Sequence, residues 1–89
     1  MKNTLQTTAD VVKAARTEQE MNVREFGAVI GVSYSMVSLY EQGKAEPKDD
    51  QLRDWLHGPV EWISDMAAEI FVTRWRRLIK LGVPHPTAS

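Results

Sequence analysis

Residues 22–43 read Asn-Val-Arg-Glu-Phe-Gly-Ala-Val-Ile-Gly-Val-Ser-Tyr-Ser-Met-Val-Ser-Leu-Tyr-Glu-Gln-Gly, and this stretch decides the fold. Asn22 is a candidate N-cap for a helix over 23–30, and Gly31 stands where a left-handed C-cap residue belongs. The serine two residues later can cap a further helix over 33–42. The stretch therefore predicts two short helices joined by a tight Gly-Val-Ser turn, which is helix-turn-helix geometry.

Apolar and small residues occupy the spacings that lock these two helices together, namely Phe26, Gly27, Ile30, Val32, Val37 and Tyr40. Glycine or an alanine-sized residue is wanted at position 27, because a larger side chain would push the crossing helices apart. Once the locking positions face inward, the second helix keeps one short, uncharged outer face. That face consists of Ser33, Tyr34, Ser35, Ser38 and Leu39.

Three further helices are predicted outside this motif. One starts behind threonine N-cap candidates and runs over about 8–17. Another covers 49–56 and begins after Pro47, which forbids helix continuation. Pro59 fits the first position of a last helix over about 60–80. Because no segment predicts a strand convincingly, the expected fold class is all-α, a small bundle of five helices with an extended C-terminal helix.

The composition fits one small domain. The chain has 89 residues, of which 43% are hydrophobic and 26% charged, which is ordinary for a globular protein. We expect a single domain over 1–89, built from a four-helix core at 7–58, the long helix at 59–81 and a tail at 82–89. Its net charge of −1 argues against a protein that coats nucleic acid non-specifically.

Several function classes lack the residues that they need. The chain has no cysteine, and His57 and His85 have no partner at metal-ligand or triad spacing. The carboxylates of Asp49, Asp50 and Asp54 suit the start of a helix better than a catalytic site. We therefore expect no enzyme, metal or cofactor. The absence of a long apolar stretch predicts no membrane span or secretory signal, and hence a cytoplasmic protein.

The sequence resembles the Cro and phage-repressor family of helix-turn-helix regulators over about residues 11–63. The residues that carry the resemblance are Arg16, Phe26, Gly27, Gly31-Val32-Ser33, Val37-Ser38, Glu41-Gln42-Gly43-Lys44, Pro47 and Val60-Glu61-Trp62-Ile63. The family usually has alanine at the position of Gly27. The resemblance implies that the helix over 33–42 enters the major groove of DNA and that the loop after it touches phosphates.

Carried over to the matching positions, the resemblance assigns three kinds of residue. The expected base contacts are Tyr34, Ser35 and Ser38. For phosphate contacts, the resemblance points to Asn22 and Lys44. Ser33 and Arg24 are further expected phosphate contacts, although Arg24 could equally be a solvated helix residue. In this family an arginine of the first helix pairs with the glutamate that ends the recognition helix, so Arg16 and Glu41 are expected to form a largely buried, bidentate ion pair.

Two departures from the family pattern concern the reading of DNA. Val23 stands where the family usually has a phosphate-binding glutamine, so one anchoring contact is lost. Recognition helices in this family are also often richer in Gln, Arg or Asn, the residues that make bidentate contacts with bases. Serine and tyrosine discriminate less per contact, which shifts specificity toward water-mediated and shape readout.

The long C-terminal helix is expected to form a dimer. Its apolar residues gather on one broad face, and four short helices cannot cover a helix of about 30 Å. The residues expected at the dimer interface are Phe71, Trp75, Leu78 and Ile79. An acidic first half (Glu61, Asp65, Glu69) and a basic second half (Arg74, Arg76, Arg77, Lys80) fit antiparallel packing. Complementation of the helix dipole explains the same gradient, and contact of the basic end with DNA or a toxin is a third possibility.

The function expected first is a sequence-specific transcriptional repressor of phage, prophage or plasmid type. It would bind an inverted-repeat operator as a homodimer, with one recognition helix in each half-site. One alternative is an antitoxin that binds both DNA and a toxin, and a second protein such as a toxin or antirepressor is a possible partner. The other alternative is a protein-interaction adaptor without DNA binding.

Overall fold

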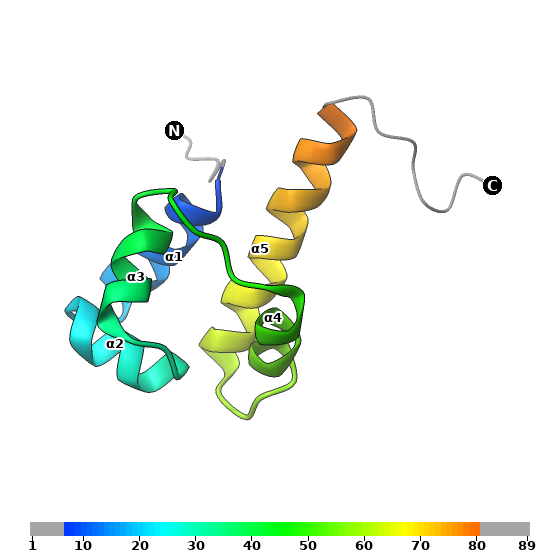
Figure 1. The fold of residues 1–89 in the computed structure, drawn as a ribbon. Helices are drawn as coiled ribbons and strands as arrows, with labels where there is room; N and C mark the ends of the chain where they lie inside the picture. Colours follow the sequence, from blue (N-terminus) through cyan, green and yellow to red (C-terminus); the bar gives the residue numbers. More distant parts are fainter. Residues whose placement is uncertain (1–6, 81–89) are drawn as a thin grey trace.

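The structure is a computed structural model that describes residues 7–80, without the side chain of Lys80. These residues form five helices and no strand (Figure 1). The helices are α1 (Thr8–Glu18), α2 (Val23–Ile30), α3 (Tyr34–Glu41), α4 (Asp49–Leu56) and α5 (Glu61–Lys80). The predicted all-α fold class is confirmed. The expected tail at 82–89, with His85, lies outside the described residues.

The helices begin where capping side chains stand. Thr7 caps α1 by accepting a hydrogen bond from the backbone of Asp10. Asn22 and Glu25 form a reciprocal capping box at the start of α2, which satisfies two of the N–H groups that a helix end leaves free. One expectation needs correction. Pro59 is not the first residue of α5, because that helix begins two residues later, at Glu61.

The end of α1 uses a left-handed residue that is not glycine. Glu20 has a φ of 57°, and the N–H of Met21 donates to the carbonyl of Arg16 across it. This is the hydrogen-bond pattern of a Schellman C-cap, in which the left-handed position usually carries glycine. Glycine does occupy that position after α2 and α3, at Gly31 and Gly43.

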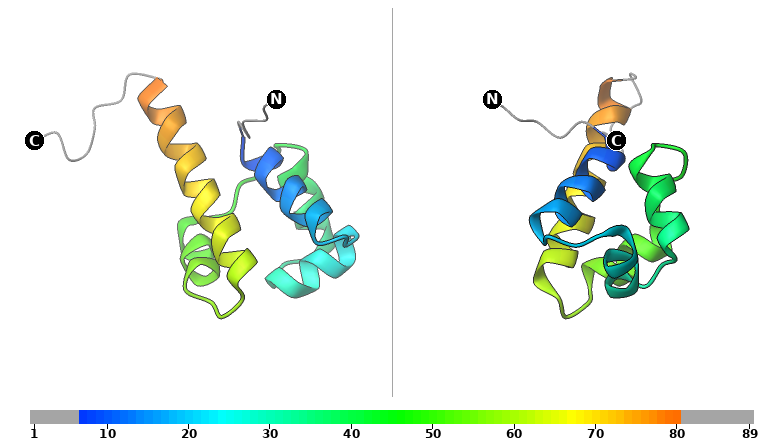
Figure 2. Two further views of the ribbon diagram at one scale, coloured as in Figure 1. Left: turned by 180° about the vertical axis from the view of Figure 1, so that it is seen from behind. Right: turned by 90° about the vertical axis from the view of Figure 1, so that its left-hand side faces the viewer.

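Packing joins α2 to α3, α1 to both α3 and α5, and α4 to α5. Figure 2 shows α5 running alongside α1 and α4, with its last turns reaching beyond the other helices. The side chains at the centre of the core come from all five helices and are Val12, Phe26, Val37, Leu52 and Ile70. The ring of Phe26 stacks on that of Trp62, with centroids 5.6 Å apart. The long helix therefore completes the core of the four short ones.

Gly27 lies at a close approach between α2 and the turn that follows it. A Cβ atom at this position would lie 2.6 Å from the carbonyl oxygen of Val32. That distance is far below ordinary van der Waals contact, and the neighbouring atom belongs to the backbone. The expectation that glycine or an alanine-sized residue is wanted here needs correction, because even the Cβ of alanine would require the backbone of the turn to shift.

Trp55 ties α4 to the end of α2. Its indole N–H donates to the carbonyl oxygen of Ile30 at 2.7 Å, and the bond is buried. The last carbonyls of a helix have no partner within the helix. Trp55 thus satisfies one of them while it fills the core beside Tyr40, whose ring it meets edge-on at 6.5 Å.

Candidate nucleic-acid interface

The expected base contacts lie together on α3. Tyr34 and Ser35 are exposed in its first turn, and Ser38 lies one turn further along and is half-buried. Met36 and Leu39 are also partly exposed beside them. Val37 and Tyr40 point into the core. The resulting surface is short and uncharged, with hydroxyl groups next to apolar atoms.

A contact between α2 and α3 links two residues that the sequence assigned to different roles. The guanidinium of Arg24 lies over the ring of Tyr34, 4.1 Å from its centroid. Stacking of this kind is worth roughly 0.5–1 kcal/mol at an exposed site. It directs Arg24 toward the first turn of α3 and restrains the Tyr34 ring. No sequence periodicity predicts this pair, because the turn between the helices sets its geometry.

The expected phosphate contacts Asn22 and Ser33 serve as helix caps. The side-chain oxygen of Asn22 accepts from the backbone N–H of Glu25 at 2.9 Å. Ser33 Oγ accepts from the N–H of Met36 at 3.2 Å. Both residues therefore stand at helix N-termini, where backbone N–H groups and the helix dipole favour anions. Lys44, also exposed, follows the C-cap of α3.

Arg16 and Glu41 form a bidentate pair between α1 and α3. Arg16 Nε lies 2.6 Å from Glu41 Oε2, and Nη2 lies 3.1 Å from Oε1. Only 21% and 12% of the two side chains are exposed. The hydrogen bond with Glu41 raises the pKa of Arg16 against the opposing effect of burial. The guanidinium also donates to the carbonyl of Met21, so one side chain holds α1, α3 and the loop between α1 and α2.

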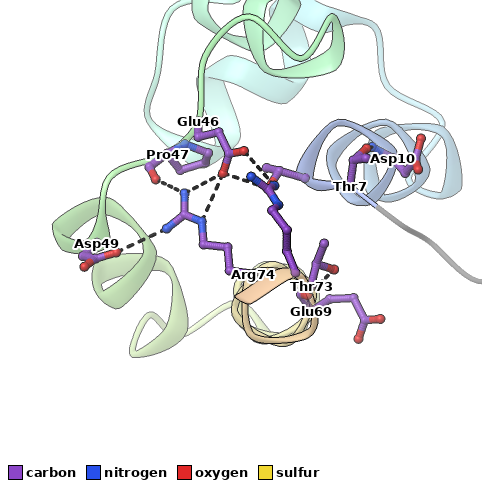
Figure 3. A network of polar contacts seen from close by, with 10 residues as sticks. Thr7, Asp10, Glu46, Pro47, Asp49, Glu69, Thr73 and Arg74 are labelled. Carbon is purple, nitrogen blue, oxygen red and sulfur yellow. Dashed lines mark hydrogen bonds and ion pairs between the residues drawn. The ribbon is translucent and has the colours of Figure 1, made fainter. Parts of the chain in front are cut away.

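A second polar network connects the loop after α3 with α5 (Figure 3). Glu46 accepts hydrogen bonds from Thr8, Arg74 and Arg77, each at 3.1 Å. Partial burial acts to raise the pKa of Glu46, but the hydrogen bonds from these donors outweigh it and lower the pKa below its ordinary value. Sequence reasoning missed the role of Glu46, because its three donors are 28 to 38 residues away.

The four residues expected at a dimer interface have different surroundings. Phe71 packs partly against the protein's own core, and Trp75 is half-buried. Leu78 and Ile79 are 43% and 52% exposed on the last turns of α5. In the basic half of α5, Arg74 and Arg77 both form ion pairs with Glu46 of the same chain.

Within residues 7–80, no group of three or more His, Asp or Glu side chains is placed to hold a metal ion. No described helix is long and apolar enough to cross a membrane.

Comparison with known families decides the relationship of the chain. A family model described as helix-turn-helix matches residues 12–57, which include the whole α2–turn–α3 unit and the Arg16–Glu41 pair. The chain belongs to this family. The match is of the Cro and phage-repressor type, and it identifies the chain as a DNA-binding transcriptional regulator. No curated protein and no solved structure matches the chain significantly. Residues 58–89, which include the whole of α5, lie outside the matched segment of this helix-turn-helix regulator.

Proposed function

We propose that this helix-turn-helix regulator is a repressor that binds an inverted-repeat operator as a homodimer. The observation that carries the proposal is the outer face of α3, which is exposed and uncharged while its inner face is locked by the core and by Glu41. A helix held in this way can enter the major groove as a rigid unit. A repressor that blocks polymerase at its operator acts in the cytoplasm, in a phage, prophage or plasmid setting.

In this proposal Tyr34, Ser35 and Ser38 read bases. Their hydroxyl groups donate and accept hydrogen bonds, and the Tyr34 ring offers an apolar surface to thymine methyl groups. Arg24 and Lys44 contact phosphates as cations, and the caps at Asn22 and Ser33 present backbone N–H groups to the same anions. Because none of the base-reading side chains forms a bidentate contact, DNA shape and bridging waters supply much of the specificity.

The test of DNA reading is selection of bound sequences from random duplex DNA. We expect an inverted repeat, because two equivalent recognition helices then meet two equivalent half-sites. Ser38→Ala should change the preference at one or two positions by roughly 1–3 kcal/mol. Lys44→Ala should weaken all duplexes alike and reduce the salt dependence of binding. Equal loss on operator and scrambled duplexes in Ser38→Ala would remove Ser38 from the reading surface.

The dimer is proposed to form through the last turns of α5. Leu78 and Ile79 are its most exposed large apolar residues, and Val72 is exposed one to two turns earlier. Phe71 and Trp75 extend this surface toward the core. Burial of such residues between two copies would stabilise the dimer by about 25 cal/mol for each Å² of apolar surface removed from water.

Sedimentation of the double variant Leu78→Asp/Ile79→Asp tests this interface. We expect a dimer for the unmodified chain and a monomer for the variant, with operator binding lost because a single half-site makes too few contacts. The control is Arg53→Asp, which places the same charge at an exposed position on α4, outside the proposed interface. A variant that remains dimeric would move the interface elsewhere.

A further inference from the structure

The loop over 44–48 carries two exposed lysines around a middle that is held in place. Lys44 and Lys48 are exposed on either side. Between them, the side chain of Pro47 is fully buried, and the carboxylate of Glu46 accepts its hydrogen bonds from α1 and α5. The loop therefore presents Lys44, the proposed phosphate contact, on a backbone that Glu46 and Pro47 hold in place.

Arg74 of α5 provides most of this fixation. Its Nε donates to Glu46 Oε1 at 3.1 Å, and its Nη1 donates to Asp49 Oδ1 at 3.2 Å. Its Nη2 donates to the backbone carbonyl of Pro47. Only 24% of the Arg74 side chain is exposed. One planar guanidinium thus fixes the loop at two residues and the start of α4 at a third, as Figure 3 shows.

Both the conformational order of the loop and the charges on it affect how well it can bind DNA. A flexible loop must lose conformational freedom when it binds, whereas a loop that is already ordered binds without that loss. Glu46 and Asp49 also place negative charges near a surface that must approach phosphates. Arg74 lies against both carboxylates and compensates them. Without it, the loop would be looser and more repulsive to DNA.

We propose that Arg74 is a positioning residue for DNA binding, which acts from α5 by holding the 44–48 loop so that Lys44 meets a phosphate. The proposal rests on the phosphate contact of Lys44 proposed above. It makes the C-terminal helix part of the DNA-binding unit, although Arg74 lies outside the segment that matches the family model.

The first test needs no DNA. Backbone order parameters of Ala45 and Glu46 are measured by NMR in the full chain and in Arg74→Ala. We expect them to fall from about 0.85, the value of a rigid backbone, toward 0.6 or below in the variant. Arg76→Ala is the matched control, because Arg76 is an exposed arginine on the same helix and has no ion-pair partner within the described part of the chain.

The second test couples the loop to DNA. Binding to the selected operator duplex is measured over a series of salt concentrations. Arg74→Ala should weaken binding roughly three- to tenfold, and Arg76→Ala much less. Once Lys44 is alanine, Arg74→Ala should have little further effect, because the contact that Arg74 positions is already gone. If Arg74 itself touched a phosphate, Arg74→Ala would instead weaken binding by the same factor whether residue 44 is lysine or alanine.

The outcomes separate the two proposals. Unchanged order parameters in Arg74→Ala would overturn the positioning role while DNA binding stands. The same holds if Arg74→Ala weakens binding by the same factor in the native chain and in Lys44→Ala. A native chain that binds no duplex in the selection would overturn the proposed function and, with it, the DNA part of this inference. If Arg74→Ala does not fold, Glu46→Gln weakens the same tie from the loop side, and a loop that stays rigid in that variant also contradicts the inference.

Discussion

Gly27 is a residue at which helix propensity and packing favour different side chains. Propensity alone favours alanine by about 1 kcal/mol inside a helix, yet a Cβ here would meet the Val32 carbonyl at 2.6 Å. We expect Gly27→Ala to destabilise the fold by about 1–3 kcal/mol in urea unfolding, because α2 and the turn must move apart. Ala28→Gly, at the exposed neighbouring position, should cost about 1 kcal/mol through propensity. A stabilising Gly27→Ala would show that the turn relaxes freely.

Arg16 concentrates three hydrogen bonds in one side chain. Removal of the guanidinium in Arg16→Met leaves the mostly buried Glu41 carboxylate without its cation, which we expect to cost about 3 kcal/mol of unfolding free energy. Replacement of both partners, in Arg16→Met/Glu41→Leu, should cost less because no charge stays unpaired. Denaturant midpoints of the two variants provide the comparison. A double variant as unstable as the single one would assign the loss to the Met21 carbonyl instead.

Individual site residues were foreseen to different degrees. The positions of Tyr34, Ser35 and Ser38 on one face follow from helical spacing, and the Arg16–Glu41 pair was expected only through the family resemblance. Neither spacing nor resemblance contains the Arg24–Tyr34 stack or the three bonds of Arg74. Such contacts depend on how separate helices are placed in space, which no local pattern records.

Helix ends were the most predictable elements of this fold. Asn22, Gly31 and Ser33 have the capping chemistry that defines α2 and α3, and the predicted bounds of α2 and α4 match the structure. The turn after α1 has no glycine at its left-handed position, so its geometry has no signal in the sequence. Pro59 stands before α5 rather than at its first residue, because the fixed φ of proline suits turn positions as well as the first turn of a helix.

The left-handed Glu20 offers a stabilising substitution. A residue with a Cβ pays about 1–2 kcal/mol in this conformation, and glycine does not. Relief of this cost stabilises the folded chain, while the greater freedom of glycine in the unfolded chain offsets part of the gain. We therefore expect Glu20→Gly to raise the unfolding free energy by about 0.5–1 kcal/mol. Thermal melting checks the direction, with Glu18→Gly as the control that should destabilise the last turn of α1. A lower melting temperature for Glu20→Gly would contradict the strain at this turn.

For the whole molecule, the Glu46 network makes stability depend on pH. The pKa of Glu46 is lowered in the folded chain, so its contribution is present above the unfolded pKa of about 4.3 and is lost as the pH falls through the folded value. At pH 7, Glu46→Gln should be less stable by up to about 1 kcal/mol, since the carboxylate is partly solvated. In urea unfolding, the difference should shrink as the pH falls below about 4.3 and vanish once Glu46 is protonated in both the folded and the unfolded chain. If Glu46→Gln were still less stable than the native chain in acid, the loss would come from packing and not from the charge of Glu46.

The stacking of Phe26 on Trp62 has a consequence for protein engineering. The segment that matches the family model ends at residue 57, while Trp62, Ile63, Met66 and Ile70 close the core above it. A transplant of the recognition helix with only its matched segment would leave that core open to water on one side. A working chimaera must carry the graft boundary past Arg77, so that both the aromatic stack and the tie to Glu46 travel with the donor sequence.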